Sequence, residues 1–314
     1  MTTGRLAPTP SGFLHLGNAR SFLLAWLWAR SLGGRVVMRI EDIDLPRCSR
    51  ELRDQALEDI AWLGLDWDEG PHAGDAIGPY DQSTRFEHYR RSLDKLVQAR
   101  RAYPCVCSRK DIEEASRAPH GDEGAVYPGT CRGRFASLAQ ARQATGREPA
   151  LRFRVDAEAV PFVDGFAGEQ PGLVRGDFVV QKRDGGPAYQ LAVVVDDAGQ
   201  GVTEVLRADD LLPSTPRQLL LYRALGLREP SFVHVPLVVG VDGLRLAKRH
   251  GDTSLRWFRQ QGVTAQALVG HLAFLLGLRP RGVPCLPHEL LRDFAWAAVP
   301  RGPVCGSDHG LSPA

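Results

Sequence analysis

"RLAPTPSGFLHLGNARSFLLAWLWARSLGGRVVMRIED", residues 5–42, is the stretch that decides the fold of this chain. It begins as a short strand that ends at prolines, continues as a leucine- and tryptophan-rich helix closed by glycines, and returns as a valine-rich strand. This order predicts an α/β fold with a right-handed βαβ unit on a parallel sheet. Because such sheets bind ligands at the carboxyl ends of their strands, residues 7–18 and 41–47 should face one another.

The composition favours one main domain with a large insertion. The chain has 314 residues, 43% of them apolar, which is enough for a proper core. A formal charge of +2 does not indicate a basic nucleic-acid protein, and we expect no DNA partner. Six cysteines are too sparse for a secreted disulfide scaffold, so we expect a cytoplasmic location. The apolar run 22–29 is too short to span a bilayer, and it predicts a buried helix rather than a membrane contact.

The remaining sequence alternates helical and strand patterns. Residues 49–63 and 81–100 predict helices, and the character changes near Tyr103, where an insertion leaves the parallel sheet. Residues 177–197, DFVVQKRDGGPAYQLAVVVDD, predict two strands joined by a glycine turn. We expect the first half of the main domain at 1–102, an inserted α+β subdomain at 103–190, the second half at 191–252, short helices at 253–300 (the last of them PHELLRDFAW) and a disordered tail at 301–314.

Two polar elements suit a triphosphate. His15 and Gly17 lie at a strand-to-helix turn, where free N–H groups, close backbone approach and an imidazole donor can meet phosphate oxygens. The alternative is that His15 only caps the helix. The second element, GLRLAKRHGD (243–252), carries Lys248, one of only four lysines in the chain. Lys248 could neutralise charge that develops at a reacting phosphorus, or the segment could be a solvated basic loop.

Taken together, the blocks of this chain resemble those of class I aminoacyl-tRNA synthetases, and of glutamyl-tRNA synthetases in particular. The resemblance covers residues 5 to about 280. It implies a Rossmann-like (HUP-type) catalytic domain with catalytic residues His15 and Lys248 and an ATP site at His15, Gly17, Asn18 and Lys248. The similar blocks are RLAPTPSGFLHLGNAR, RIEDIDLPR, PAYQLAVVVDD, RADDLLPSTPRQLLLYRALG and RLAKRHGD.

Two departures from the family pattern concern the signatures themselves. Asn18 occupies the fourth position of the first signature, where many members have histidine. In the second signature, Arg245 replaces the first lysine, and Ala247 and Arg249 replace two serines. Only the second lysine is kept, as Lys248, and we therefore assign phosphate stabilisation to it.

The resemblance also implies a site for L-glutamate. Glu41 can accept hydrogen bonds from the ammonium group, arginines can engage carboxylates as planar forks, and Tyr189 can donate from its hydroxyl. Structural alternatives are a surface pair between Glu41 and Arg39, and Tyr189 as an ordinary strand aromatic. The implied reaction is attack of the glutamate carboxylate on the α-phosphorus of ATP, with Mg²⁺, to give glutamyl-adenylate and pyrophosphate. The implied glutamate pocket is Arg5, Leu6, Ala7, Pro8, Thr9, Glu41, Tyr189 and Arg207.

Three cysteines gather in the insertion. Cys105 and Cys107 form a C-x-C pair, and Cys131 follows in YPGTC. Because structural zinc takes four ligands, three thiolates leave the set incomplete. The resemblance implies that Tyr127 supplies the fourth ligand of one structural Zn²⁺ per chain, whereas His120 is the more ordinary rival; three reduced thiols without metal are the alternative. Plain thiols are expected at Cys48, Cys285 and Cys305.

The segment after the second signature is short. About sixty residues follow Asp252, whereas glutamyl-tRNA synthetases continue into a large anticodon-binding domain. With the cysteine-bearing insertion, this pattern resembles the glutamyl-queuosine tRNA(Asp) synthetases. That resemblance implies glutamate activation without tRNA, then transfer of glutamate to the queuosine base at the wobble position of tRNA(Asp). Alternatives are a shortened glutamyl-tRNA synthetase that charges a tRNA 3′ end, a non-catalytic RNA-binding paralogue, and another nucleotidyltransferase.

Overall fold

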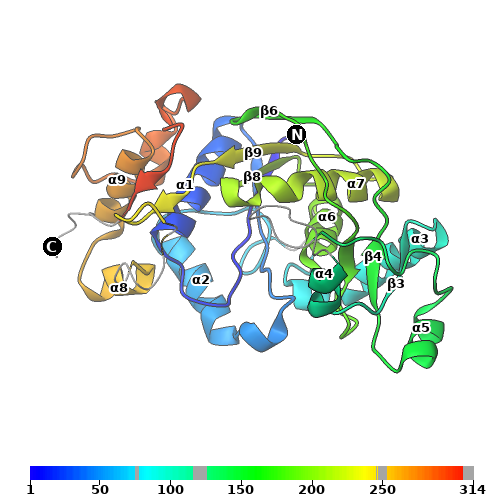
Figure 1. The fold of residues 1–314 in the computed structure, drawn as a ribbon. Helices are drawn as coiled ribbons and strands as arrows, with labels where there is room; N and C mark the ends of the chain where they lie inside the picture. The colour runs from blue at the N-terminus through cyan, green and yellow to red at the C-terminus, as the bar shows by residue number, and fades with distance from the viewer. Residues whose placement is uncertain (75–77, 116–125, 245, 247–252, 307–314) are drawn as a thin grey trace.

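Two parallel strand pairs form the centre of the molecule (Figure 1). The Thr203 N–H donates to the Thr3 carbonyl oxygen at 2.9 Å, so β1 and β8 lie next to each other and the two pairs form one layer. The pairs are β1 (Thr3–Leu6) with β2 (Arg35–Met38), and β8 (Glu204–Ala208) with β9 (Ser231–Val235). The computed structural model describes residues 1–74, 78–115, 126–244, 246 and 253–306.

Helix α1 (Leu16–Ser31) connects β1 to β2, which confirms the predicted βαβ unit. Its apolar side chains are buried almost all around, as the run of leucines and tryptophans predicted. The helix lies close against β1, because a Cβ on Gly4 would come within 2.8 Å of the Ala29 Cβ. This close approach holds β1, which carries Arg5, against the last turns of α1.

The insertion forms its own antiparallel sheet, in the order β3–β4–β7, beside α5 (Figure 1). The hairpin of β5 and β6 leaves this sheet and returns to the central layer, where the Gly165 N–H donates to the Phe232 carbonyl oxygen at 2.8 Å. The insertion is therefore joined to β9 as well as to the chain ends that flank it. Its elements are β3 (Ala102–Cys105), α4 (Arg109–Ala115), α5 (Leu138–Thr145), β4 (Ala150–Phe153), β5 (Phe162–Asp164), β6 (Gly168–Gln170) and β7 (Phe178–Gln181).

The prediction of two strands at 177–197 is wrong. Only the first is a strand, β7, and the second is helix α6 (Tyr189–Gly199), which starts just after Pro187. The run AVVVDD is buried on every side, and a short apolar run of this kind lacks the periodicity that separates helix from strand. The end of the insertion near residue 190 stays a prediction.

Other helices agree with the predictions in part. Helix α3 (Phe86–Gln98) begins five residues later than expected, after the short 3₁₀ turn Gln82–Thr84. The last predicted helix, PHELLRDFAW, is replaced by two 3₁₀ turns, Pro287–Leu290 and Trp296–Ala298. The remaining elements are α2 (Arg50–Trp62), α7 (Thr215–Leu225), α8 (Leu255–Gln260), α9 (Ala265–Leu275) and the 3₁₀ turns Leu45–Arg47 and Asp209–Ser214.

The C-terminal residues are more ordered than expected. β11 (Val304–Cys305) pairs in parallel with β10 (Val238–Val239), so the prediction of a disordered tail over 301–314 is wrong for its first residues. A Cβ on Gly306 would come within 2.5 Å of Val238 Cγ1, which shows how closely this segment packs on β10. Residues 307–314 lie outside the described part. Within the described residues, every helix is too short or too polar to cross a lipid bilayer.

Candidate functional site

A cavity of about 520 Å³ opens where β1, β2 and β8 end. Its wall includes the turn before α1, the first residue of α6 and the start of β10. Residues 7–18 and Glu41 therefore face one another, as the βαβ unit predicted. The predicted site residues that line the cavity are Arg5, Ala7, Pro8, Thr9, His15, Gly17, Asn18, Glu41, Tyr189 and Arg207. Leu6 does not line it, because its side chain is fully buried in the core.

His15 caps helix α1. Its Nδ1 accepts from the Gly17 N–H at 3.1 Å, and the Asn18 side-chain oxygen accepts from the His15 N–H at 3.1 Å. His15 thus caps the helix, and the cap fixes the tautomer: Nδ1 is an acceptor, so a neutral ring carries its proton on Nε2. The role of His15 at a phosphate stays a prediction. A Cβ on Gly17 would come within 3.0 Å of His15 Cε1, so glycine is what lets the ring lie over the first turn. His15 also lines the cavity.

Lys248 lies outside the described residues, as do Arg245, Ala247 and Arg249. The flanks of this segment are described, and both meet the start of α1. Leu246 is buried in the same core cluster as Leu16 and Val238. On the other side, the Leu16 N–H donates to the Thr253 carbonyl oxygen at 3.1 Å, and the Leu255 N–H donates to the Leu14 carbonyl oxygen at 2.8 Å. The described residues on the two sides of Lys248, Leu246 and Thr253, therefore lie near the start of α1, where His15 is the N-cap.

Arg5, Arg39 and Glu41 form a buried ionic network around Asp197. Asp197 Oδ1 lies 3.2 Å from Arg5 Nε and accepts from Arg39 Nη1 at 2.7 Å, and Arg39 Nη2 donates to Glu41 Oε1 at 3.0 Å. The pair of Arg39 and Glu41 exists, but it is not a surface pair, because the Arg39 side chain is 0% exposed. Burial alone would lower the pKa of Arg39, yet the carboxylates of Asp197 and Glu41 raise it well above its ordinary value.

Arg207 is held differently, by uncharged groups. Its Nε donates to His234 Nε2 at 2.9 Å and its Nη2 donates to Thr215 Oγ1 at 3.0 Å. Nη1 is buried and has no hydrogen-bond partner within the described part of the chain. Burial lowers the pKa of Arg207. A buried guanidinium without a direct carboxylate partner is costly, and an anionic ligand in the cavity would satisfy it.

Tyr189 is the first residue of α6 and lines the cavity beside Arg207, so the interpretation as a strand aromatic is wrong. Burial raises the pKa of the Tyr189 phenol, and the charge of Glu41 adds to the effect. The hydroxyl therefore keeps its proton and can donate to a carboxylate. Sequence reasoning missed Asp197, His234 and Thr215, which contact the predicted arginines. It also missed Asp164, which contacts His234.

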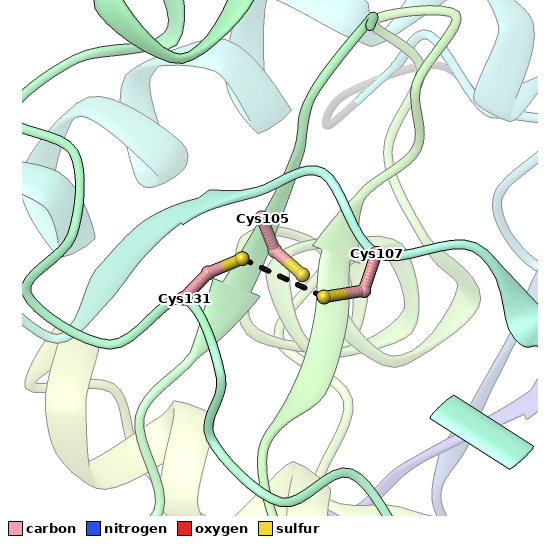
Figure 2. A group of neighbouring side chains, drawn as sticks. All are labelled: Cys105, Cys107 and Cys131. Atoms are coloured by element: carbon pink, nitrogen blue, oxygen red, sulfur yellow. Dashed lines mark hydrogen bonds between the residues drawn. The ribbon is translucent and has the colours of Figure 1, made fainter. Parts of the chain in front are cut away.

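The three cysteines of the insertion converge (Figure 2). Their sulfur atoms lie within 4.8 Å of one another, and Cys107 Sγ is 3.6 Å from Cys131 Sγ. Two thiolates on a tetrahedral zinc, each about 2.3 Å from the metal, are about 3.8 Å apart. Burial raises the pKa of the Cys107 thiol to about 12, a cost that a divalent cation would remove by binding the thiolate. The cluster fits a metal ion of this kind.

Tyr127 lies at the same cluster. Its hydroxyl oxygen is 3.4 Å from Cys105 Sγ and accepts from the Cys131 N–H at 2.8 Å. The Arg152 guanidinium lies over the Tyr127 ring at 4.0 Å and donates to Cys105 Sγ at 3.2 Å, so a positive charge faces the thiolate set. His120 lies outside the described residues. Cys48, Cys285 and Cys305 are free thiols.

Comparison with known proteins gives consistent matches. A family model described as the catalytic domain of class I tRNA synthetases (E and Q) matches residues 1–290. A glutamyl-Q tRNA(Asp) synthetase of Symbiobacterium thermophilum is 54% identical over 97% of this chain and 95% of its own length. A glutamate–tRNA ligase of Heliobacterium modesticaldum is 44% identical over 96% of this chain, which covers 62% of that relative.

A similar fold occurs in a solved structure. The glutamate-tRNA synthetase of Elizabethkingia anophelis superposes with a TM-score of 0.82 and is 26% identical, over 98% of this chain and 68% of its own. Sequence and structure therefore agree on the architecture around the cavity.

Proposed function

The chain belongs to the glutamyl-Q tRNA(Asp) synthetases, ligase-type members of the class I aminoacyl-tRNA synthetase family, and we propose that it activates L-glutamate with ATP in the absence of tRNA. Glutamate is then transferred from glutamyl-adenylate to the queuosine base at the anticodon wobble position of tRNA(Asp). The names of the full-length relatives support this choice of acceptor.

The observation that carries glutamate recognition is the buried, uncharged setting of Arg207. Arg5 and Arg39 pair with the carboxylates of Asp197 and Glu41, whereas the hydrogen-bond partners of Arg207 are uncharged. The charge of Arg207 is therefore available to a carboxylate of glutamate. Glu41 then faces the ammonium, while Arg207 and Tyr189 engage a carboxylate.

In the proposed reaction, an α-carboxylate oxygen of glutamate attacks the α-phosphorus of ATP. A new carbon-linked O–P bond forms, the bond to the β-phosphate bridging oxygen breaks, and pyrophosphate leaves with that electron pair. His15 Nε2–H donates to phosphate oxygens, and Lys248 neutralises negative charge as pyrophosphate departs. Mg²⁺, which accompanies ATP in this family, supplies further charge neutralisation. Catalysis consists of positioning and electrostatic stabilisation, with no covalent bond to the protein.

An acceptor experiment tests the second step. Radiolabelled glutamate is incubated with ATP, the protein and one of three tRNA(Asp) samples: with queuosine, without it, or with queuosine but without the 3′-terminal adenosine. We expect label on the first and third samples only. Label that appears whether or not queuosine is present, and that is lost when the terminal adenosine is removed, would instead show that the protein is a shortened synthetase that charges the tRNA 3′ end.

We further propose that Cys105, Cys107, Cys131 and Tyr127 hold one structural Zn²⁺. The purified protein is expected to contain about one zinc per chain by elemental analysis, because the donor set is compact and tetrahedral in spacing. The double change Cys105→Ser and Cys107→Ser should abolish zinc binding and lower Tm, since structural zinc contributes directly to folding. Cys305→Ser, at an exposed thiol outside the cluster, is the matched control and should change neither quantity.

Two results would decide against this zinc site. Metal-free protein with full activity and unchanged Tm would restore the interpretation of three reduced thiols. The change Tyr127→Phe removes the hydroxyl but keeps an aromatic ring under Arg152. If this variant binds zinc as tightly as the unchanged protein, the phenolate is not a ligand.

A further inference from the structure

His234 is buried between a carboxylate and the arginine of the cavity. Its Nδ1 lies 2.6 Å from Asp164 Oδ2, its Nε2 lies 2.9 Å from Arg207 Nε, and the side chains of His234 and Asp164 are both 0% exposed. His234 comes from β9, whereas Asp164 ends β5 of the insertion. The insertion thus reaches the cavity through two consecutive hydrogen bonds.

The hydrogen bonds allow one protonation state of this imidazole. Arg207 Nε can only donate, so His234 Nε2 must accept, and the ring proton must lie on Nδ1 and point to Asp164. Thr215 Oγ1, 3.3 Å from the same Nε2, accepts a hydrogen bond from Arg207 Nη2. Burial lowers the pKa of His234, which keeps the ring neutral.

The orientation of Asp164 is fixed independently. Its Oδ1 accepts from three backbone N–H groups, those of Phe166, Ala167 and His234, at 2.8 to 3.1 Å. Only Oδ2 is left for the imidazole. Although burial raises the pKa of Asp164, the hydrogen bonds from His234 and the backbone lower it below its ordinary value. The carboxylate therefore stays ionised and holds the Nδ1 proton.

We propose that Asp164 and His234 are positioning residues for substrate binding, which hold Arg207 through a neutral imidazole acceptor so that its orientation is fixed while its charge stays available to a carboxylate of glutamate. The inference rests on the proposed function. A carboxylate in direct contact would orient the guanidinium equally well, but it would also neutralise it and weaken its attraction for an anionic ligand. Because an imidazole lies between Asp164 and Arg207, the guanidinium is oriented without being neutralised.

Asp164→Asn tests this arrangement with little change in shape. The three backbone N–H groups require an oxygen at the Oδ1 position, so the new NH₂ must occupy the Oδ2 position and donate to His234 Nδ1. The ring proton then moves to Nε2, where it faces the Arg207 Nε–H, so that two donors meet and the hydrogen bond between His234 and Arg207 is lost. We expect the KM for glutamate in tRNA-independent ATP–pyrophosphate exchange to rise by about tenfold or more, with the KM for ATP changed less than about twofold.

The tautomer itself is measured by ¹⁵N NMR of the histidine rings, with His234→Gln used to assign the signal. In the unchanged protein the proton should lie on Nδ1, and in Asp164→Asn on Nε2. His271→Leu removes another buried histidine, far along the chain in α9, and serves as the control for lost packing. It should lower stability without raising the KM for glutamate.

The outcomes separate the two proposals. An Nε2 proton on His234 of the unchanged protein would overturn the inference, and so would a tautomer that inverts in Asp164→Asn while the KM for glutamate stays unchanged. Absence of glutamate-dependent exchange in the unchanged protein would overturn the proposed function instead. A rise in the KM for glutamate that His271→Leu reproduces would reduce the role of His234 to packing.

Discussion

Replacing Arg207 with leucine is expected to raise the KM for glutamate about 10²–10³-fold in ATP–pyrophosphate exchange. Leucine removes the buried guanidinium whose Nη1 has no hydrogen-bond partner within the described residues, and the ligand carboxylate would then be desolvated beside an apolar group. The KM for ATP should change little, since His15 and Gly17, to which we assign the phosphates, lie on a different element. Steady-state exchange kinetics at varied glutamate and fixed saturating ATP measure the effect.

Two further variants separate the effect of the Arg207 charge from the effect of its geometry and of lost packing. Arg207→Lys keeps a positive charge but loses the fork that reaches His234 and Thr215 together, so its KM should fall between those of the unchanged protein and Arg207→Leu. Arg217→Leu, at a half-buried arginine of α7 outside the cavity lining, is the matched control. Glutamate kinetics in Arg207→Leu equal to those of Arg217→Leu would exclude Arg207 from the glutamate site.

The central architecture was predictable because its signals are local. The strand–helix–strand pattern at 5–42 required only adjacent residues, and parallel strands then bring residues 7–18 opposite Glu41 by topology. His15 was recognisable as both a cap and a cavity residue for the same reason, since it stands at a strand-to-helix turn. Each of these positions follows from chain order.

The groups that orient the arginines were not predictable in this way. Asp197 bridges Arg5 and Arg39 across separations of more than 150 residues, and Asp164 meets His234 from a hairpin of the insertion. An aspartate in PFVDGF and a histidine in SFVHV look like ordinary strand residues, because no spacing rule links two strands that come together only in the tertiary fold. The same limit applies to α6, where complete burial removes the periodicity that would mark a helix.

The ordered C-terminal strand bears on the second signature. β11 pairs with β10, whose Val238 carbonyl oxygen accepts from the Leu246 N–H at 3.4 Å, while Thr253 and Leu255 bind the backbone on either side of His15. The described residues on both sides of Lys248 are thereby attached near His15, at the end of the cavity to which we assign the triphosphate. Sequence alone indicated only a basic segment. The attachment of Leu246, Thr253 and Leu255 favours a role at the triphosphate over that of a solvated loop.

Lys248→Ala is therefore expected to lower kcat of glutamate-dependent ATP–pyrophosphate exchange by about 10²–10³-fold, the range found when one preorganised electrostatic donor is removed from an active site. The KM for glutamate should stay within about twofold, because the residues that we propose bind it, Arg207 and Glu41, are unchanged. The signature has lost its first lysine and both serines, so no second ammonium in RLAKR can compensate.

Lys182→Ala provides the control for loss of a lysine, since Lys182 follows β7, pairs with Asp184 and does not line the cavity. It should leave kcat and both KM values unchanged. Single-turnover formation of glutamyl-adenylate, measured by rapid quench, separates slow chemistry from slow pyrophosphate release in Lys248→Ala. If the adenylate forms at the unchanged rate there, transition-state stabilisation must come from other groups at the phosphate end, of which the His15 imidazole, fixed as an Nε2 donor by its own helix cap, is the first to test.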